Sequence, residues 1–429
     1  MLIRKAFQYR AYPNKTQTIQ LDRILWLCRD LYNGALYERR EAWRLAHKSL
    51  SCYEQINELP AVKEVAPEYK DVPSHVLQDV IRRLDKAFQA FFRRIKAGQT
   101  PGFPRFVGRG RYASFTYPDQ AGWKLTAGQL HLTGLGRLRI FFHRPIEGTI
   151  KTLTVRRDAD HWYISFACEV EIPDPPAADE PTAVGIDLGL LHFATLSTGE
   201  HIANPRPLRT AEARLAIAQV RLTRCQKRSK RRGRARLRVS RLHRKVRHQR
   251  RDFLHKLSRR LVNEYGLIVF EELAIRNLTR RPKAKVDADQ SAAAGETVYA
   301  PNGAAAKAGL NKSIHDAGWR MFQDFCASKA AWAGRIVLFV NPAYTSQTCS
   351  GCGVIRKKAL AERWHSCPEC GCELDRDHNA AVNIFRLGLS LRASVEAPGY
   401  KPGEEVTGYN LRSPAERLSR FEGLGLSGC

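Results

Sequence analysis

Acidic residues are scarce in this chain of 429 residues, because 42 Asp and Glu face 71 Lys and Arg and leave a formal net charge of +29. Such an excess says little about the fold, but it favours a polyanionic partner. The sequence also lacks an apolar run of the about 18 residues that a transmembrane helix needs, and its start lacks a signal-peptide core. We therefore expect a soluble intracellular protein with no membrane partner.

Disulfide pairing is not indicated either. The cysteines number eleven, which is odd, and only the five near residue 360 are clustered, so the rest fit isolated thiols in a reducing compartment. Four of the five form two knuckles, Cys349/Cys352 and Cys367/Cys370, with the spacing C-x2-C-x14-C-x2-C and a glycine after each knuckle. This pattern predicts a structural Zn²⁺ that is closed by four thiolates and is not catalytic. Cys372 is a spare thiol that could compete with Cys370.

The first 170 residues change from a helical to a strand-like pattern. Apolar residues recur at helical spacing from about residue 21 to 36 and from about 74 to 95. From residue 123 to 170 they alternate with polar ones, which predicts an antiparallel β-barrel or a small sandwich. Between these regions, the GFPRF motif around Arg105 interleaves basic and aromatic residues, which suits base stacking and phosphate contact. The alternative is that its aromatic side chains only anchor the loop to the core. The Pro-rich stretch 172–182 indicates a domain boundary.

Most of the net positive charge lies in one segment. Residues 221–260 hold 19 Lys and Arg against a single acid, Asp252. Apolar residues keep helical spacing through it, so we expect an amphipathic helix that forms a hairpin with the preceding helix around a break near Gly233. A polyanion would relieve the repulsion among so many like charges. The candidates for nucleic-acid contact in this segment are Arg231, Arg232, Arg244 and Lys245.

Three acids lie at the ends of apolar elements: Asp187 in VGIDLG, Glu271 in VFEEL and Asp377 at the start of HNAAVNIF. An acid in a buried strand is costly unless it is paired or coordinated. The order of expected elements is that of a ribonuclease-H-like fold, in which three carboxylates converge on two divalent ions. Oxygen ligands favour Mg²⁺. Two such ions would stabilise the attacking and leaving oxygens of a phosphodiester displacement.

Two neighbouring acids complicate this assignment. Adjacent residues of a strand point to opposite faces, so only one of Glu271 and Glu272 can face the ions. In the segment DRDHN, Asp377 is nearer the helix and is our choice. Asp375 is then left to cap the turn or to support the site indirectly.

At these residues the chain resembles the TnpB family, the RuvC-like nucleases that bacterial and archaeal insertion sequences encode and that are relatives of type V CRISPR effectors. The resemblance extends to about residue 390. It implies that Asp187, Glu271 and Asp377 are the catalytic triad and that the four knuckle cysteines hold zinc. The motifs that carry it are IRKAFQYRAYPNKTQ, GFPRF, VGIDLGL, RRDFLHKL, VFEEL, LNKSIHDAGW, YTSQTCSGCG, and CPECG followed by DRDHNAAVNI.

The resemblance implies an RNA-guided DNA endonuclease. In the family, a guide RNA from the transposon end pairs with the target strand of double-stranded DNA, the protein recognises a short flanking motif, and a single RuvC-like site cuts. His75 and Gln78 fall at a helix start that resembles the flanking-motif reader, and a Gln amide can pair with adenine.

The resemblance also implies a prokaryotic, cytoplasmic protein that is nucleoid-associated when bound to DNA. The oligomeric state is open, with a monomer favoured.

The expected fold class is α/β plus a β-barrel. It combines an RNase H-like (RuvC) nuclease domain, which contains an inserted zinc ribbon, with an N-terminal wedge-type β-barrel that contains an inserted helical recognition module. The expected boundaries are 1–12 and 122–172 for the wedge barrel, 13–121 for the recognition module, 183–344 and 373–392 for the nuclease domain (with the basic helix at 221–260, a mobile lid loop at 279–312 and a helix from 313 to 333), 345–372 for the zinc ribbon and 393–429 for a disordered tail.

Three other functions stay open at this point. A catalytically silent RNA-guided DNA-binding repressor is disfavoured because Asp187, Glu271 and Asp377 are all present. A CRISPR-associated type V effector would have the same kind of chain, and only the neighbouring genes would distinguish it. A transposase is disfavoured because the resemblance is to an accessory nuclease and not to the enzyme that joins strands.

Overall fold

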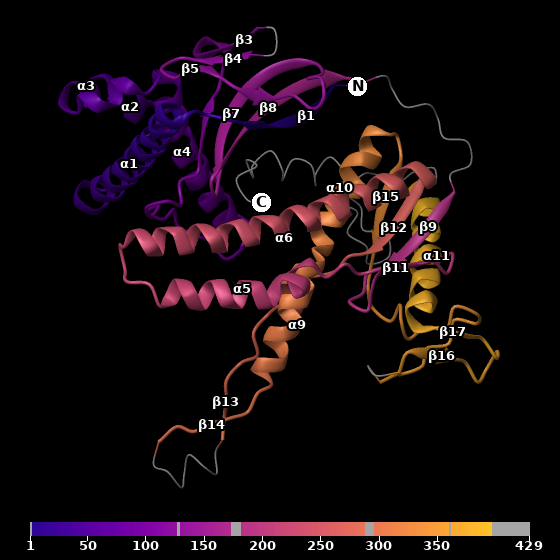
Figure 1. The fold of residues 1–429 in the computed structure, drawn as a ribbon. Coiled ribbons are helices and arrows are strands. Elements are labelled where there is room, and N and C mark those ends of the chain that lie inside the picture. The colour runs from indigo at the N-terminus through magenta and orange to yellow at the C-terminus, as the bar shows by residue number, and fades with distance from the viewer. Residues whose placement is uncertain (1, 127–128, 173–181, 288–295, 360–361, 397–429) are drawn as a thin grey trace. The chain divides into compact units, whose positions relative to one another are not determined.

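The structure is a computed structural model that describes residues 2–126, 129–172, 182–287, 296–359 and 362–396 (Figure 1). These residues fall into two compact units, the first up to residue 172 and the second from residue 182. The expected linker lies between the units, and its residues 173–181 lie outside the described residues, as does the tail from residue 397. Within the described ranges, no helix combines the length and the apolar character needed to cross a membrane.

The first unit contains a five-stranded antiparallel sheet with the order β2-β7-β8-β1-β6 and a three-stranded sheet with the order β3-β4-β5 (Figure 1). The predicted alternation is confirmed, since Leu153, Val155, Ile164 and Phe166 are all buried. β2 and β6 are the edges of the larger sheet, and closure into a wedge barrel stays a prediction. The strands are β1 (Leu2–Ala11), β2 (Ser114–Tyr117), β3 (Trp123–Thr126), β4 (Gln129–Leu132), β5 (Gly136–Leu138), β6 (Ile140–Phe141), β7 (Thr149–Asp158) and β8 (His161–Glu171).

Two long helices of the first unit, α1 and α4, pack on the apolar stripes that the sequence predicts. Asn14 starts α1 with a capping box: its side chain accepts a hydrogen bond from Gln17 N over 2.8 Å, and the Gln17 side chain accepts one from Asn14 N over 3.1 Å. The helices of this unit are α1 (Lys15–Ala46), α2 (Cys52–Asn57), α3 (Leu59–Val65) and α4 (Ser74–Lys96), with the short 3-10 helices η1 (Pro67–Asp71) and η2 (Gln120–Gly122).

One strand lies inside the segment 13–121, which we expected to be helical. β2 pairs with β7 along its whole length. Arg83 of α4 fastens this strand to the helix, because its guanidinium donates to Ser114 O over 2.8 Å and to Thr116 Oγ1 over 2.5 Å. The sheet therefore includes β2, and the predicted boundary at residue 122 is too late.

The second unit is built on a five-stranded sheet with the order β11-β10-β9-β12-β15. β9, β12 and β15 run parallel, whereas β10 and β11 are antiparallel to their neighbours. Its elements are β9 (Ala183–Asp187), β10 (His192–Leu196), β11 (His201–Ala203), α5 (Pro207–Thr223), α6 (Lys230–Glu264), β12 (Leu267–Glu271), α7 (Ile275–Leu278), β13 (Lys285–Val286), β14 (Tyr299–Ala300), α9 (Ala304–Ala317), α10 (Trp319–Trp332), β15 (Ile336–Val340), β16 (Trp364–Ser366), β17 (Glu373–Asp375) and α11 (Arg376–Glu396).

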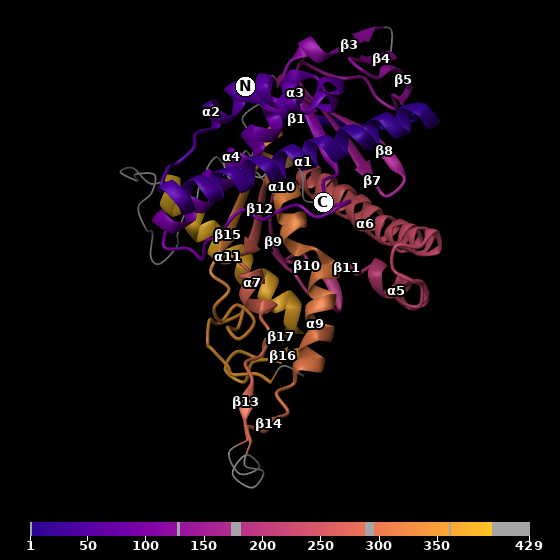
Figure 2. The same ribbon diagram turned by 90° about the vertical axis from the view of Figure 1, so that its left-hand side faces the viewer.

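Helices cover both faces of this sheet (Figure 2). On β12, Ile268 and Phe270 belong to the core cluster that includes α6 and α10, whereas Leu267 and Val269 belong to the cluster with α11. The contact with α11 is close, because a Cβ at Gly185 of β9 would lie 2.3 Å from the carbonyl oxygen of Ala381. A strand buried on both faces explains the continuous apolar runs in the sequence.

The basic segment forms the predicted helical hairpin of α5 and α6, but the break lies before Gly233 (Figure 1). Ser229 caps α6 by accepting a hydrogen bond from Arg232 N over 3.1 Å. The Arg232 guanidinium closes the turn by donating to the carbonyl oxygens of Leu222 and Cys225, over 2.9 and 3.0 Å. A serine N-cap stabilises a helix by about 1 kcal/mol, which matches the cost of one helical glycine, so Gly233 stays inside the helix.

The expected mobile loop at 279–312 contains regular structure where it is described. β13 and β14 form a small hairpin, and α9 begins at Ala304; residues 288–295 lie outside the described residues. Alanine has the highest helix propensity, so the Ala-rich composition that looked aperiodic supports a helix. The helix expected from 313 to 333 is divided at Gly318, whose φ of +72° separates α9 from α10.

The cysteine-rich segment connects β15 to α11. Within it, β16 and β17 pair in antiparallel register from Trp364↔Asp375 to Ser366↔Glu373. The ribbon therefore continues past the expected boundary at residue 372. α11 continues to Glu396, so the first residues of the expected disordered tail at 393–429 are helical.

Candidate active site and metal centre

The alternation of side chains along two neighbouring strands brings Asp187 and Glu271 together. Val184 and Ile186 of β9 face the α6 and α10 side, so Asp187 faces the α11 side. The same count on β12 places Glu271 on that side too. The strands are parallel and in register at Phe270↔Ile186, so the two acids end their strands at the same level.

Asp377 enters from the first turn of α11. The Asp375 side chain caps this helix, because its Oδ1 accepts hydrogen bonds from the backbone N–H groups of Asp377 and His378, over 2.9 and 3.2 Å. Of the two roles left open for Asp375, the structure shows the cap of the turn. Asp377 lies near the β9–β10 turn, since its Oδ2 is 3.9 Å from the position of a Cβ at Gly189.

The three carboxylates interact electrostatically. Burial raises the pKa of Asp187 well above its ordinary value; the negative charges of Glu271 and Asp377 raise it further, and Arg376 lowers it. Burial also raises the pKa of Glu271. A bound cation would offset the repulsion between half-buried like charges of this kind. The donor set of three carboxylates fits a hard divalent ion such as Mg²⁺.

Glu271 has a hydrogen-bond donor of its own. The Thr345 hydroxyl donates to Glu271 Oε1, and this hydrogen bond lowers the pKa of Glu271 against the effect of burial. The backbone oxygen of Glu271 accepts a hydrogen bond from Gln323 Nε2 over 3.1 Å. Glu272 is exposed and its N–H donates to Val340 O over 2.8 Å, so of the two adjacent glutamates it is Glu271 that faces the other acids.

The four knuckle cysteines also meet. The sulfur atoms of Cys349 and Cys370 lie 3.6 Å apart, as do those of Cys352 and Cys367, and all four lie within 4.8 Å of one another. Four thiolates about 2.3 Å from a common tetrahedral zinc would be about 3.8 Å apart. The cluster could therefore hold a metal ion such as zinc.

Backbone geometry supports the knuckles. Gly353 and Gly371 each have a positive φ, of 83° and 69°, which favours glycine after a tight turn. The spare thiol, Cys372, lies within 4.8 Å of Cys349 and of the buried His365 as a second group of possible ligands. Competition of Cys372 with Cys370 for an ion stays a prediction.

A buried polar contact joins the first knuckle to the helix that carries Asp377. Asn383 Nδ2 donates to Thr345 O and Thr348 O over 2.9 and 2.7 Å. Asn379 Nδ2 donates to Thr348 O over 2.8 Å, and its Oδ1 accepts from Ser350 N over 2.9 Å. Both asparagines are buried, so these hydrogen bonds satisfy amides that would otherwise destabilise the fold.

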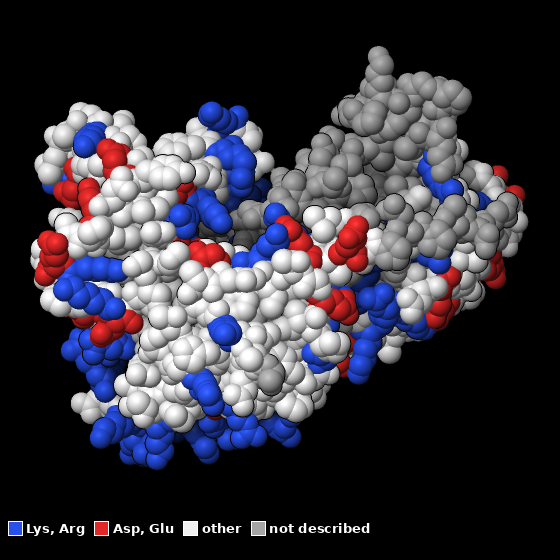
Figure 3. Space-filling view, turned by 90° about the horizontal axis from the view of Figure 1, so that it is seen from above, with Lys and Arg blue, Asp and Glu red and all other residues white. Residues whose placement is uncertain are grey.

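Of the four residues predicted to contact nucleic acid on the basic helix, three are exposed or half-buried and one holds the α5–α6 turn together. Arg231 and Lys245 are exposed, and Arg244 is half-buried. Arg232 instead holds the α5–α6 turn, as described above. Figure 3 shows Lys and Arg side chains gathered along the lower edge of one face of the molecule with few acids among them.

The other candidates lie on the first unit. His75 and Gln78 lie near the start of α4, and His75 Nδ1 is 2.6 Å from Asp119 Oδ2. Arg105 lines a pocket of about 470 Å³ with Phe103 and Phe106, an arrangement compatible with the predicted stacking role. The part of all three residues in nucleic-acid binding stays a prediction.

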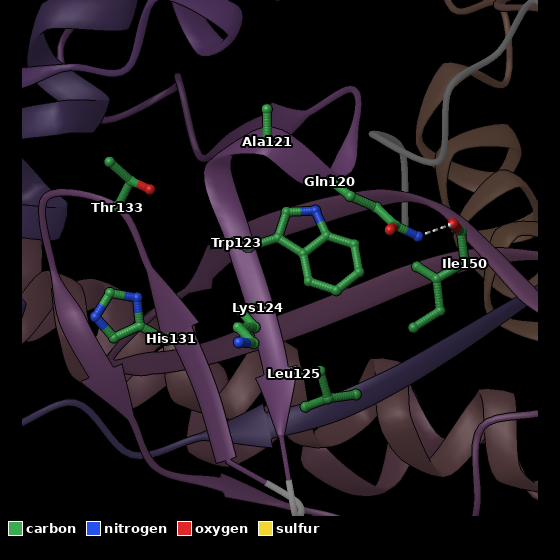
Figure 4. Close-up of a pocket in the computed structure, with 8 residues that line it drawn as sticks. All are labelled: Gln120, Ala121, Trp123, Lys124, Leu125, His131, Thr133 and Ile150. Atoms are coloured by element: carbon green, nitrogen blue, oxygen red, sulfur yellow. Dashed lines mark hydrogen bonds between the residues drawn. The ribbon is translucent and has the colours of Figure 1, made fainter.

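A larger pocket, of about 630 Å³, lies beside β3 and β4 (Figure 4). Trp123 forms its wall, and Gln120 Nε2 donates to Ile150 O over 3.2 Å at its edge. No carboxylate or cysteine is among the residues that line it, so it offers no site for the predicted metals. Its lining residues are Gln120, Ala121, Trp123, Lys124, Leu125, His131, Thr133 and Ile150.

Sequence reasoning missed Thr345, Asn379 and Asn383. All three lie in the motifs that carry the family resemblance, YTSQTCSGCG and DRDHNAAVNI. For Thr345 the available signal was its position soon after β15, which is parallel to β12, the strand that carries Glu271. The carboxyl ends of parallel strands share one edge of a sheet, so a polar residue there is expected near Glu271.

Three family models match the chain. Residues 165–281 match one described as "Probable transposase", residues 319–384 one described as "Cas12f1-like, TNB domain", and residues 1–48 one described as "Helix-turn-helix domain". The last description differs from the structure, in which residues 2–11 form a strand and residues 15–46 a single helix.

Two relatives match nearly the whole chain. One from Streptomyces pristinaespiralis, named "Putative RNA-guided DNA endonuclease", is 35% identical and covers 94% of this chain and 93% of its own. InsQ of Escherichia coli K12, with the same description, is 31% identical and covers 91% and 94%. The chain belongs to the TnpB family. A TnpB-like protein of Acanthamoeba polyphaga mimivirus is 26% identical over 57% of this chain and 45% of its own.

The solved structures are more distant. That of the mini-RNA-guided endonuclease CRISPR-Cas_phi3 covers 90% of this chain and 92% of its own, with 10% identity and a TM-score of 0.41. A TM-score this low supports no argument about this protein. Membership of the TnpB family therefore rests on the sequence relatives.

Proposed function

We propose that this protein is an RNA-guided DNA endonuclease that hydrolyses DNA at one RuvC-like site. The observation that carries the proposal is the electrostatic interaction of Asp187 with Glu271 and Asp377, in a chain that belongs to the TnpB family. The sheet order, with three parallel and two antiparallel strands, supports an RNase H-like fold for this unit.

Asp187, Glu271 and Asp377 would hold two Mg²⁺ ions. When bound, two such ions stabilise both the attacking and the leaving oxygen of a phosphodiester displacement. The chain supplies the positions of the ligands: two strand ends fix Asp187 and Glu271, and the Asp375 cap fixes the helix start that carries Asp377. Burial raises the pKa of Asp187 and the negative charges of Glu271 and Asp377 raise it further; bound cations would offset the second effect.

The four knuckle cysteines would hold a structural Zn²⁺. With four protein ligands, the ion would have no open position for substrate. Its role would be to fold the connection between β15 and α11, and hence to keep the start of α11 in place.

Guide RNA and double-stranded DNA are the proposed partners. The exposed cations of α6 would contact phosphates, and base pairing with the guide would select the target strand. His75 and Gln78 are proposed readers of the flanking motif. The names of the two relatives support RNA guidance.

The test uses the full-length chain expressed from its own locus. RNA that copurifies is sequenced, and DNA matched to it is offered with Mg²⁺. We expect the wild type to cut, and Asp187→Asn to bind the same RNA without cutting. Undiminished cleavage by Asp187→Asn would overturn the active-site assignment, and copurification of random RNA would overturn RNA guidance.

A further inference from the structure

Thr345 lies in the segment that connects β15 to the cysteine-rich ribbon. β15 ends at Val340, beside the strand that carries Glu271, and the chain then reaches Thr345, which is only 4% exposed. Its hydroxyl donates to Glu271 Oε1 and lies 3.2 Å from Pro342 O. The carboxylate carries the greater negative charge, so it is the stronger acceptor.

The backbone of the same residue is held from the opposite side. Asn383 of α11 donates to Thr345 O over 2.9 Å and to Thr348 O over 2.7 Å. α11 is also the helix whose first turn carries Asp377. Thr345 is therefore bonded through its side chain to one candidate metal ligand and through its backbone to the helix that bears another.

Further contacts fix the segment in the ribbon. Ser350 N donates to Asn379 Oδ1 over 2.9 Å, and the Arg386 guanidinium donates to Ser350 O. Cys349, the first knuckle cysteine, directly precedes Ser350 and is 1% exposed. A segment with so many buried and satisfied polar groups is rigid, which is the property that a support for catalytic ligands needs.

We propose that Thr345 is a positioning residue that holds the Glu271 carboxylate in its metal-binding orientation and couples it, through Asn383, to the helix that carries Asp377. This inference rests on the proposed function. Thr345 holds Oε1, which leaves Oε2 of Glu271 to bind the ion. The ribbon thereby acts on the active site by orienting two carboxylates, and its own metal takes no part in the chemical step.

The experiment compares three variants of the full-length protein loaded with its RNA. Thr345→Val keeps the shape and removes the hydroxyl, whereas Thr345→Ser keeps the hydroxyl. Thr348→Val is the matched control, because the Thr348 hydroxyl donates to Tyr344 O over 3.0 Å, a contact that involves no carboxylate. Cleavage rate, the Mg²⁺ concentration for half-maximal rate, DNA affinity, zinc content and Tm are measured for each.

We expect Thr345→Val to lose about 10- to 100-fold in cleavage rate, the range expected when a hydrogen bond to a charged group is removed, and to need more Mg²⁺. DNA affinity and zinc content should stay at the wild-type value. Thr345→Ser should recover most of the rate, and Thr348→Val should match the wild type. Recovery by serine is the result that a purely structural role would not give.

Two results would overturn the proposal. One is a Thr345→Val protein that cuts at the wild-type rate and Mg²⁺ requirement while Asp187→Asn is inactive; this would leave the proposed function standing. The other is equal loss in Thr345→Val and Thr345→Ser together with loss of zinc, which would make Thr345 a folding residue only. Full activity of Asp187→Asn would instead reject the active site itself.

Discussion

Replacing Arg231, Arg234 and Lys245 by glutamine tests whether α6 is a nucleic-acid surface. These three side chains are exposed and, within the described residues, take part in no ion pair that the structure shows. Arg232 is left unchanged because it closes the α5–α6 turn. Glutamine keeps helix propensity close to that of arginine and lysine, so the substitution removes charge with little effect on the helix.

The expected change in salt dependence follows from the number of phosphates that the variant no longer neutralises. Each neutralised phosphate adds about 0.7 to the slope of log K against log salt for a single strand and about 0.9 for a duplex, so three phosphates add about 2 to 3. Between about 50 and 200 mM salt, the wild type should therefore lose roughly 20- to 40-fold more affinity than the variant.

The assay is fluorescence anisotropy with labelled copurifying RNA over this range of salt. The control variant removes Lys256 and Arg260 from the same helix, where each lies 2.8 Å from an acid, Asp252 and Glu200 respectively. Cations that are already paired with an acid of the protein neutralise fewer phosphates and so release fewer counterions from the RNA. Per charge removed, this control should therefore change the slope of log K against log salt less than the triple variant does. A slope equal to that of the wild type in the triple variant would refute α6 as the binding surface.

Three further predictions concern the metals and the acids. Asp187→Asn should raise the Tm of Mg²⁺-free protein, measured by calorimetry, because it removes a half-buried charge that is disfavoured by burial and by repulsion from Glu271 and Asp377. An unchanged Tm would contradict this. The Mg²⁺ concentration needed for half-maximal cleavage should rise as pH falls, because protons compete with Mg²⁺ for carboxylates whose pKa is raised. In Mg²⁺-free protein, Asp187 and Glu271 should lower the free energy of unfolding as pH rises through their raised pKa values. Cys367→Ser should lose zinc and cleavage with RNA affinity kept, whereas Cys225→Ser should lose neither.

The sequence predicts the candidate site better than it predicts its surroundings. Asp187 and Glu271 could be chosen because charge in a continuous apolar run is costly, and strand alternation alone shows that only one of Glu271 and Glu272 can face the other acids. The cysteine spacing likewise indicates a metal cluster without knowledge of the fold. In each case the signal is local, so it does not depend on tertiary structure.

The errors occurred where local signals were weak or balanced. The start of α9 was missed because Ala-rich sequence lacks the amphipathic period. The division of the helix expected from 313 to 333 into the end of α9 and α10 depends on one residue with left-handed backbone angles, Gly318. β2 was missed because four residues are too short for a reliable alternation. Thr345 has only a weak signal, since its partner Glu271 is brought near it by the pairing of β12 with β15.

The position of the cysteine-rich connection in the chain would let the proposed closed metal site affect catalysis. The connection from Asn341 to Asp375 starts beside Glu271 and ends at the helix that carries Asp377. Closing a flexible loop of about 35 residues costs about 3 kcal/mol beyond a constant term, whereas structural zinc supplies about 10–16 kcal/mol in small zinc domains. A bound metal would therefore outweigh the entropy of the loop and hold both of its ends. β9 and β12 hold the backbones of Asp187 and Glu271, so metal loss should displace Asp377 and free the Glu271 side chain from Thr345, while Asp187 stays in place.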